Sequence, residues 1–310
     1  MLKVIAGSFL LLSAAWAQDC GVQSIPPIID GLSGRIVNGI EARPNSWPWQ
    51  VTMCRRGEDD PQGLACRLIC GATIIRPDVL LTAAHCVVGM NPDEIAYKYA
   101  HHSLSSTEED GQGIARVQEF VPHPRYDSRR ATNDIAIVRL ADTINFGEKA
   151  QPICVANTDE HLTEGTAMFD IGWGRIGGED PPSDTLRQTL LHHHDRPTCT
   201  RLFLQLFQFL DNTVSCAGGT DDGKAVCFGD SGGPYFKKDD VDGRYYQFGV
   251  NSFVLSRACY QEDRPNGFAR VPVLCDFLEE QVGESVCSTP GEALRGVRRR
   301  VLAPVKPIVD

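Results

Sequence analysis

Three short stretches of the sequence hold residue types that could together carry out acyl transfer. Ser231 lies in Gly229-Asp230-Ser231-Gly232-Gly233, where the glycines allow backbone N–H groups to approach a ligand closely. His85 follows an apolar run and offers an imidazole that can accept a hydroxyl proton. Asp134 stands directly before another apolar run, where its carboxylate could orient that imidazole. These side chains would supply a nucleophile, a base and an orienting group, and the N–H groups of Gly229 and Ser231 suit an oxyanion hole.

Each stretch has a plainer explanation when it is considered alone. A histidine in an apolar context is more often a core residue with satisfied hydrogen bonds than a catalytic base. An aspartate before a strand is commonly a turn former. The assignment therefore depends on the combination, because chance rarely places all three stretches in one chain in this order.

The elements that must position these residues are predicted to be strands. From Ile36 to about Val273, short apolar runs rich in β-branched and aromatic residues alternate with turn clusters, which predicts an all-β barrel or sandwich. Two stretches, 197–209 and 272–282, have helical character. The clearest strand candidates are Trp49–Met53, Ala72–Ile75, Ile135–Leu140 and Gln247–Val250.

The N-terminus has the organisation of a secretory signal peptide. Lys3 precedes an apolar run that ends in Ala15-Trp16-Ala17, which predicts cleavage before Gln18 and a secreted, extracellular protein. A membrane anchor is the alternative, but the run is short and lacks a stop-transfer flank. We expect a signal peptide at 1–17, a lead segment at 18–35, a folded domain at 36–287 and a disordered tail at 288–310.

The composition excludes several classes of partner. The chain of 310 residues has 30 Lys and Arg against 40 Asp and Glu, a formal charge of −10. This balance argues against nucleic acid or an anionic membrane as the main partner. Its 12 cysteines are many for a cytosolic protein and indicate disulfides in an oxidising compartment.

The three motifs together resemble those of the chymotrypsin-like serine peptidases. The resemblance runs from Cys20 to about Val282, and its lead segment, which starts Cys20-Gly21-Val22, resembles that of chymotrypsinogens. It implies two six-stranded antiparallel Greek-key barrels with a C-terminal helix. It also implies a catalytic triad of His85, Asp134 and Ser231 that acts without a cofactor. A non-catalytic binding homologue on the same fold is a competing interpretation, which the intact triad disfavours.

The resemblance implies synthesis as a zymogen. Arg35-Ile36-Val37-Asn38-Gly39 resembles the family's cleavage site, so cutting after Arg35 would free the α-amino group of Ile36. In the family this ammonium pairs with the acid before the nucleophile, here Asp230, and orders the oxyanion loop. Expected partners are protein or peptide substrates, an activating trypsin-like protease and protein inhibitors of proteases.

The resemblance implies four disulfides, and the four cysteines left over suggest two more. The family pattern implies Cys20–Cys154, Cys70–Cys86, Cys199–Cys216 and Cys227–Cys259. One family bridge is missing, since Met168 and Lys237 occupy both of its positions. The four remaining cysteines suggest Cys54–Cys66 closing a hairpin and Cys275–Cys287 fixing the terminal helix. A free or intermolecular thiol among these four is the alternative.

The resemblance also implies which residues line the substrate pocket, and their types indicate that this pocket is narrow and apolar. Ala225 and Val226 stand at its floor, where trypsin-like members carry an aspartate, so a basic substrate side chain would lack a partner. Val254 replaces the glycine of chymotrypsin-like members and would narrow the pocket, as in elastase-like members. We expect cleavage after small or medium apolar residues, with a chymotrypsin-like preference for Phe, Tyr or Leu as the alternative. The expected substrate-binding residues are Ala225, Val226, Phe228, Ser252, Phe253, Val254 and Asn266.

No metal site is expected. Three consecutive side chains, His192-His193-His194, fan outward and are more typical of a polar surface loop than of a zinc site. The family's calcium loop usually begins with a glutamate near Ala100 to His102, and none stands there.

Overall fold

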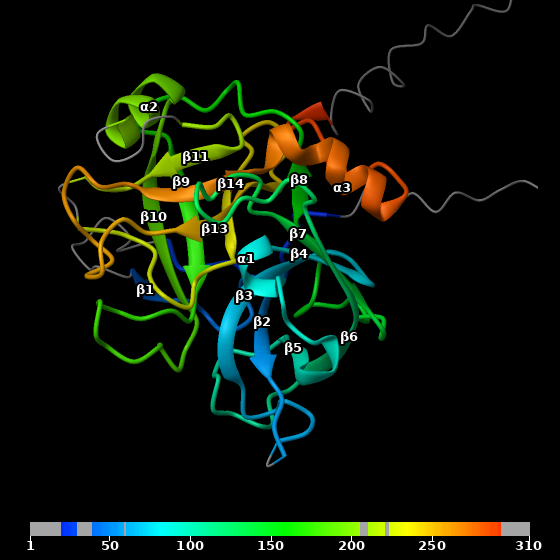
Figure 1. The fold of residues 1–310 in the computed structure, drawn as a ribbon. Helices are drawn as coiled ribbons and strands as arrows, with labels where there is room; N and C mark the ends of the chain where they lie inside the picture. The colour runs from blue at the N-terminus through cyan, green and yellow to red at the C-terminus, as the bar shows by residue number, and fades with distance from the viewer. Residues whose placement is uncertain (1–19, 30–38, 59, 205–209, 221–222, 293–310) are drawn as a thin grey trace, which may run out of the picture.

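The computed structural model describes residues 20–29, 39–58, 60–204, 210–220 and 223–292. The predicted signal peptide, the Arg35–Ile36 bond and most of the predicted tail lie outside the described residues. Figure 1 shows two lobes of antiparallel strands that meet along one side, with α1 (Ala84–Val87) near their junction.

The first lobe is a closed barrel of six strands. Its order around the ring is β2-β3-β4-β7-β6-β5, and every neighbouring pair is antiparallel. The predicted strands at 49–53, 72–75 and 135–140 are confirmed within it. The strands are β2 (Gln50–Arg55), β3 (Arg67–Arg76), β4 (Val79–Thr82), β5 (Ile95–Tyr99), β6 (Gly113–Pro122) and β7 (Ala136–Leu140).

The second lobe closes in the same way. Its order is β12-β9-β10-β11-β14-β13, and pairing of β12 with β13 completes the ring. Three short strands attach to its edges: β1 (Ile40–Glu41) pairs with β10, while β8 (Cys154–Ala156) pairs in parallel with β13 and β15 (Cys287–Ser288). The two expected six-stranded antiparallel barrels are therefore confirmed. The ring strands are β9 (Ala167–Gly172), β10 (Arg187–His194), β11 (Val214–Ala217), β12 (Pro234–Lys238), β13 (Tyr245–Phe253) and β14 (Asn266–Arg270).

Few residues are helical. Besides α1, the described helices are α2 (Arg196–Leu204), α3 (Cys275–Val282) and the 3-10 turns η2 (Pro92–Glu94) and η3 (Val271–Leu274). The helix predicted over 272–282 is present as η3 followed by α3. None of the described helices is long and apolar enough to cross a membrane. The predicted tail begins too early, because Ser288 pairs with Ala156 and Gly291 donates to Asp242 Oδ2.

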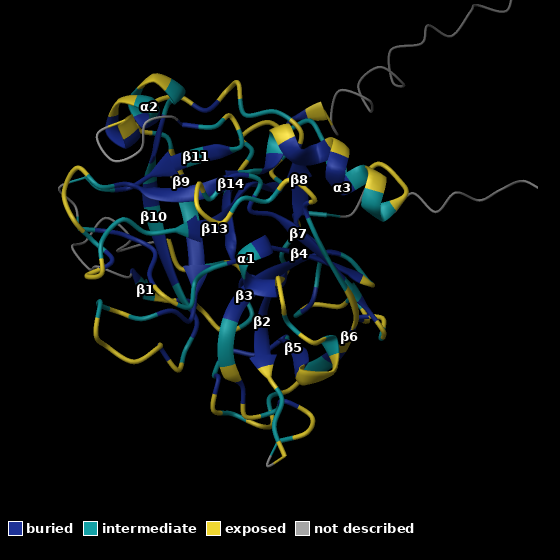
Figure 2. Cartoon of the chain, viewed as in Figure 1, coloured by how far each residue is buried: buried dark blue, intermediate teal, exposed yellow. Residues whose placement is uncertain are grey.

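An aromatic cluster joins the two barrels. Trp47, which precedes β2, lies with its ring centroid 5.1 Å from Phe169, 5.0 Å from Phe236 and 5.4 Å from Tyr245 of the second barrel. Figure 2 shows that most of the strands are buried, whereas exposed residues gather in the loops. Such aromatic pairs contribute about 0.5–1.5 kcal/mol each beyond area burial, so the cluster helps to fix how the barrels meet.

All twelve cysteines are paired, in the six combinations suggested above. Cys54–Cys66 closes the β2–β3 hairpin, and Cys275–Cys287 ties α3 to β15. Cys20–Cys154 fastens the start of the lead segment to the second barrel, where Gly21 N also donates to Pro152 O at 2.8 Å.

The histidine run is not a surface loop, so that prediction was wrong. It forms the end of β10, and His193 and His194 are 7% and 9% exposed. His194 bonds Glu164 Oε1 and Gly218 O, both at 2.8 Å, and His193 Nδ1 lies 3.2 Å from Tyr235 Oη. Alternation along a strand sends these neighbours to opposite faces, where each finds its own partner.

A buried ammonium holds the loop that follows β5. Lys98 is 0% exposed, and its Nζ donates to the carbonyls of Leu64, Ser103, Leu104 and Ser106 at 3.1, 3.3, 3.5 and 2.5 Å. Burial lowers the pKa of Lys98, whereas Glu109, Asp184 and Asp60 raise it. The loop after Ala100 to His102, where the family's calcium loop was considered, is thus organised around a cation that belongs to the chain itself.

Lys98→Met should destabilise the protein by more than about 2 kcal/mol, because four buried or part-buried carbonyls would lose a charged donor. The measurement is denaturant unfolding in a Ser231→Ala background, which lacks the predicted nucleophile. Lys149→Met is the matched control, since Lys149 bonds the 97%-exposed Asp110, and its effect should stay within about 0.5 kcal/mol. Equal losses in both variants would contradict the role of Lys98.

Candidate active site

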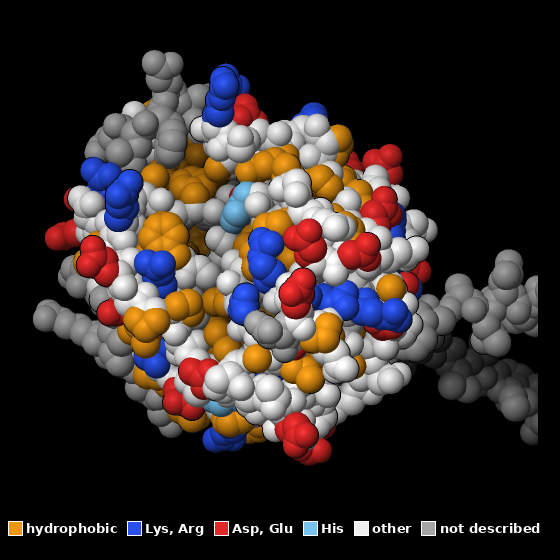
Figure 3. Space-filling model, turned by 60° about the horizontal axis from the view of Figure 1, so that its bottom comes forward, with side chains coloured by type: hydrophobic (Ala, Val, Ile, Leu, Met, Phe, Trp, Pro, Cys, Tyr) orange, Lys and Arg blue, Asp and Glu red, His pale blue; other side chains and the backbone are white. Residues whose placement is uncertain are grey.

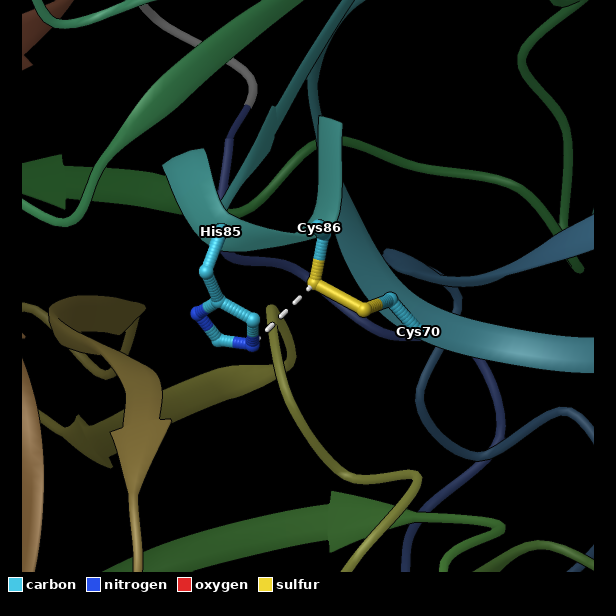
Figure 4. Close-up of side chains that lie close together, drawn as sticks. All are labelled: Cys70, His85 and Cys86. Carbon is cyan, nitrogen blue, oxygen red and sulfur yellow. Dashed lines mark hydrogen bonds between the residues drawn. A yellow bond between two sulfur atoms is a disulfide. The ribbon is translucent and has the colours of Figure 1, made fainter. Parts of the chain in front are cut away.

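His85 is presented at the junction of the barrels by β4 and α1. The strand ends at Thr82, and the short helix holds Ala84, Cys86 and Val87 buried while the His85 side chain is 30% exposed. The Cys70–Cys86 disulfide anchors this helix to β3. Figure 4 shows the imidazole beside that disulfide, with Nε2 3.6 Å from Cys86 Sγ.

Asp134 fixes the orientation of the His85 imidazole through the other ring nitrogen, Nδ1. Its carboxylate is 2% exposed, Oδ2 lies 2.7 Å from His85 Nδ1, and Oδ1 accepts the His85 backbone N–H at 2.9 Å. Ser252 Oγ, from β13 of the second barrel, donates to Oδ2 at 2.5 Å. An ionised carboxylate only accepts, so it requires the proton on Nδ1 and leaves Nε2 free to accept one.

The loop of Ser231 packs directly on the first barrel. Gly71 N donates to Ser231 O at 2.7 Å. Gly232 has φ of +80°, and a Cβ there would lie 2.3 Å from Thr82 Oγ1 and 2.4 Å from Gly71 O. Only glycine fits this contact, which explains the residue after the serine in structural terms.

Two backbone donors beside Ser231 have no acceptor within the part of the chain that the structure describes. They are the N–H groups of Gly229 and Ser231, the pair expected to bind an oxyanion. Gly229 has φ of +104°. Ser231 Oγ makes no hydrogen bond to His85 or to any other described residue. The structure therefore brings the His85–Asp134 pair and the serine loop to one junction without joining the serine to the imidazole.

Cys70, His85 and Cys86 have ligand-type atoms within 4.8 Å of one another. Zinc is bound by thiolates, but these two sulfurs form a disulfide, so the donor set does not fit a metal (Figure 4).

The Asp230 carboxyl turns inward, away from Ser231. Oδ1 accepts the N–H of Gly174 at 2.8 Å and Oδ2 that of Cys227 at 2.9 Å. Burial raises the pKa of Asp230 to about 6, while the two backbone hydrogen bonds lower it. The group lines a pocket behind the serine loop, together with Gln188 and Ala225. The expected partner, Ile36, lies outside the described residues.

Of the expected specificity residues, Ser252 and Phe253 lie on β13 and Asn266 lies on β14, while Ala225, Val226 and Phe228 lie in the segment before Ser231 and Val254 follows β13. Ala225 and Val226 are 4% and 3% exposed, and Val226 N donates to Asn266 Oδ1 at 3.2 Å. Val254 packs against the hydrophobic cluster that contains Val226. The remaining three differ in setting. Phe253 lies against Gly267, Phe228 lies under the Arg175 guanidinium at 5.8 Å, and Ser252 bonds Asp134.

Sequence patterns missed two polar contacts. Ser252 was expected at the substrate pocket, but its hydroxyl donates to Asp134. Asn251, its neighbour, donates through Nδ2 to Asp170 Oδ1 at 3.0 Å and to Asp230 O at 3.1 Å. No local motif marks either contact, because each joins residues far apart in the chain.

The surface near the barrel junction is hollowed. Figure 3 shows a depression bordered by hydrophobic side chains, with a histidine at its edge. A hollow bordered by apolar side chains is a common setting for a binding site.

Comparisons with known proteins agree with this geometry. The family model described as Trypsin matches residues 36–278. Chymotrypsin-C of Mus musculus is 33% identical over 270 residues, which cover 86% of this chain and 95% of that protein. Chymotrypsin-like elastase family member 3B of Macaca mulatta is 32% identical over 252 residues, which cover 81% and 94%. Serine protease 56 of Homo sapiens is 31% identical over 258 residues, which cover 83% of this chain and 40% of that protein.

The fold, the match over most of the chain and the length shared with two of these relatives lead to one conclusion: this chain belongs to the trypsin family and is a serine endopeptidase.

Proposed function

We propose that this serine endopeptidase is secreted as an inactive precursor, is activated by cleavage between Arg35 and Ile36, and cleaves after small or medium apolar residues. The catalytic assignment is carried by one observation, the hydrogen-bonded series from Ser252 through Asp134 to His85 beside the Ser231 loop. The predicted signal peptide and the six disulfides support secretion.

In the proposed mechanism Ser231 Oγ attacks the carbonyl carbon of the scissile bond. His85 Nε2 takes the hydroxyl proton, and Asp134 stabilises the resulting imidazolium through Nδ1. The N–H groups of Gly229 and Ser231 donate to the oxyanion. Hydrogen bonds of this kind are often absent or long without substrate, so we place the Ser231–His85 bond in the substrate complex.

The imidazolium then protonates the leaving amine as the C–N bond breaks, which leaves an acyl group on Ser231. A water molecule attacks this ester while His85 again takes a proton. The acid product leaves and Ser231 regains its proton. The carboxylate of Asp134 stays ionised throughout.

The proposed activation is supported by charge and by chain position. A buried Asp230 without a cation is costly, and the ammonium of a new N-terminus would relieve that cost. The family match begins at Ile36, the residue that cleavage after Arg35 would expose. We propose that pairing with Asp230 orders the adjacent oxyanion donors. The Cys20–Cys154 bridge would keep the cleaved lead segment attached.

The proposed specificity depends on Val254, Ala225 and Val226, whose side chains are apolar. A second specificity, for Phe, Tyr or Leu, is favoured by the likeness to a protein named chymotrypsin-C. Proposed partners are protein substrates, an activating protease that cuts after arginine, and protein inhibitors that occupy the same groove.

Ser231→Ala should lower kcat by at least about 10⁴-fold, because it removes the nucleophile. Asp134→Asn should lower kcat by about 10⁴-fold, because the amide that replaces the carboxylate would favour the wrong tautomer of the His85 imidazole. The measurement is turnover of a peptide amide by the activated protein. Ser105→Ala, at a serine outside the junction, is the control and should keep wild-type turnover. Full activity in Ser231→Ala would overturn the assignment.

Trypsin treatment of the purified precursor should create activity together with a new N-terminus, Ile36-Val37-Asn38-Gly39. N-terminal sequencing and non-reducing electrophoresis are the measurements, and the lead peptide should be released only by reductant. Arg35→Gln should stay inactive after the same treatment. Activity that appears without cleavage at this bond would rule out the proposed activation.

Val254→Gly should shift preference from Ala or Val toward Phe by roughly ten- to two-hundredfold in kcat/KM, because the isopropyl group occupies volume that a ring needs. Peptide substrates that differ only before the scissile bond measure this. Val241→Gly, a 58%-exposed valine on a loop, is the control and should leave the preference unchanged. A wild-type preference for Phe or Tyr would exclude the elastase-like specificity and favour the second one.

A further inference from the structure

The pocket behind the Ser231 loop contains a second acidic side chain. Asp170 of β9 lines it opposite β10, together with Asp230. The sequence patterns account for Asp230, but they give Asp170 no role. Two carboxyl groups facing one buried space are costly unless a proton or a cation lies between them.

Asp170 is held so that one oxygen remains unused. The residue is 2% exposed, and its Oδ1 accepts from Asn251 Nδ2 at 3.0 Å. Its Oδ2 is buried and has no hydrogen-bond partner among the described residues. The same Asn251 Nδ2 donates to the backbone oxygen of Asp230 at 3.1 Å, so one amide connects Asp170 to the serine loop.

The charged and titratable groups around Asp170 leave the pocket acidic. Asp230 faces it from the serine loop, and Arg187 lines the pocket from β10 but donates to Gly39 O at 2.8 Å. Tyr235 of β12 pairs with Asp170 in the strand ladder, and its hydroxyl lies 3.2 Å from His193 Nδ1. Burial, and next the charge of Asp230, raise the pKa of Asp170 well above its usual range.

The chain before β1 is anchored at the rim of this pocket. Gly39 has φ of +70°, and a Cβ there would lie 1.8 Å from Gln188 O, a residue that lines the pocket. Gln188 Nε2 also donates to Ile28 O of the lead segment. Residues 36–38 span at most about 10 Å, so an N-terminus at residue 36 stays within reach of the pocket.

We propose that Asp170 is a second receptor for the Ile36 ammonium, so that the new N-terminus is held by two carboxylates instead of one. This inference depends on the proposed activation after Arg35. In the precursor the Ile36 nitrogen is part of a peptide bond, so the two carboxyl groups share the pocket without this ammonium, and at least one retains a proton. Entry of the ammonium releases that proton and gives the unused Asp170 Oδ2 a donor. Asp170 is therefore a positioning residue, which acts on Ser231 through the N-terminus and Asn251.

The alkaline limit of activity tests this role. An ammonium between two carboxylates keeps its proton to higher pH than one beside a single carboxylate. In activated Asp170→Asn, the alkaline half-point of kcat/KM should fall by about one pH unit, while the acid limb stays in place. The rate at which cyanate carbamylates Ile36 at pH 8 should rise about tenfold, measured by mass spectrometry of the N-terminal peptide.

Two further variants separate this inference from the proposed activation. Asp142→Asn is the matched control, because it also removes one carboxylate, here from a surface ion pair with Arg116. It should change neither the alkaline half-point of kcat/KM nor the rate of carbamylation. Asp230→Asn should abolish activity. If cleavage after Arg35 fails to activate the wild type, the proposed activation fails. If it activates, but Asp170→Asn leaves the alkaline half-point and the carbamylation rate unchanged, only the role of Asp170 fails.

The uncleaved precursor provides a second measurement. An acid whose pKa is raised on folding binds more protons in the folded state, so stability falls as pH rises from the unfolded value toward the folded one. The unfolding free energy of the Ser231→Ala precursor should therefore fall between pH 4 and 7, and less in a Ser231→Ala/Asp170→Asn precursor. Equal falls would overturn the inference. If Asp170→Asn does not fold, carboxyl ¹³C titrations of wild type should show Asp170 ionising on activation, and an unchanged titration would contradict the role.

Discussion

The buried carboxylate of Asp134 is the interaction on which the site depends. It accepts hydrogen bonds from His85 of the first barrel and from Ser252 of the second, so it is satisfied only when the barrels meet in one arrangement. An ionised carboxylate that lost these donors while buried would be strongly destabilising. The aromatic cluster around Trp47 and the contact of Gly71 N with Ser231 O hold the same junction from other sides. Folding and catalytic geometry are thereby coupled, because the hydrogen bonds that join the barrels also orient the imidazole.

A second constraint lies behind the nucleophile. The backbone of the Ser231 loop is packed against the first barrel with no room for a side chain at Gly232, and its other side faces a pocket lined by the two acids Asp170 and Asp230. An ammonium that entered this pocket would stabilise the ionised carboxylates and with them the loop. The proposed zymogen mechanism follows from this balance: the chain carries the cation within its own sequence, and cleavage makes it available. Lys98 has a comparable role in a distant loop, where its buried amine donates to four carbonyl groups.

The two barrels, and the meeting of the segments around His85, Asp134 and Ser231, could be predicted from the sequence because local patterns encode them. Continuous apolar runs such as Ile135–Leu140 indicate a strand that is buried on both faces, and the glycines around Ser231 indicate close backbone packing. Contacts between distant residues escaped prediction. The Ser252–Asp134 bond, the buried Lys98 and the Asp170 carboxyl all depend on which strands become neighbours, and hydrophobic patterns do not encode that. His193 and His194 were misplaced for a related reason, since polar side chains in a short run suggest a loop until the strand that buries them is known.

The central claim is that His85, Asp134 and Ser231 act as one unit that transfers an acyl group to the serine. The most direct measurement is mass spectrometry of the activated protein, mixed at mildly acidic pH with a nitrophenyl ester of a small acyl group and then digested. The account predicts a stoichiometric acyl adduct on the peptide that contains Ser231, formed in a burst, and no adduct in Asp134→Asn on the same timescale. Turnover without an adduct, or an adduct on another residue, would contradict it.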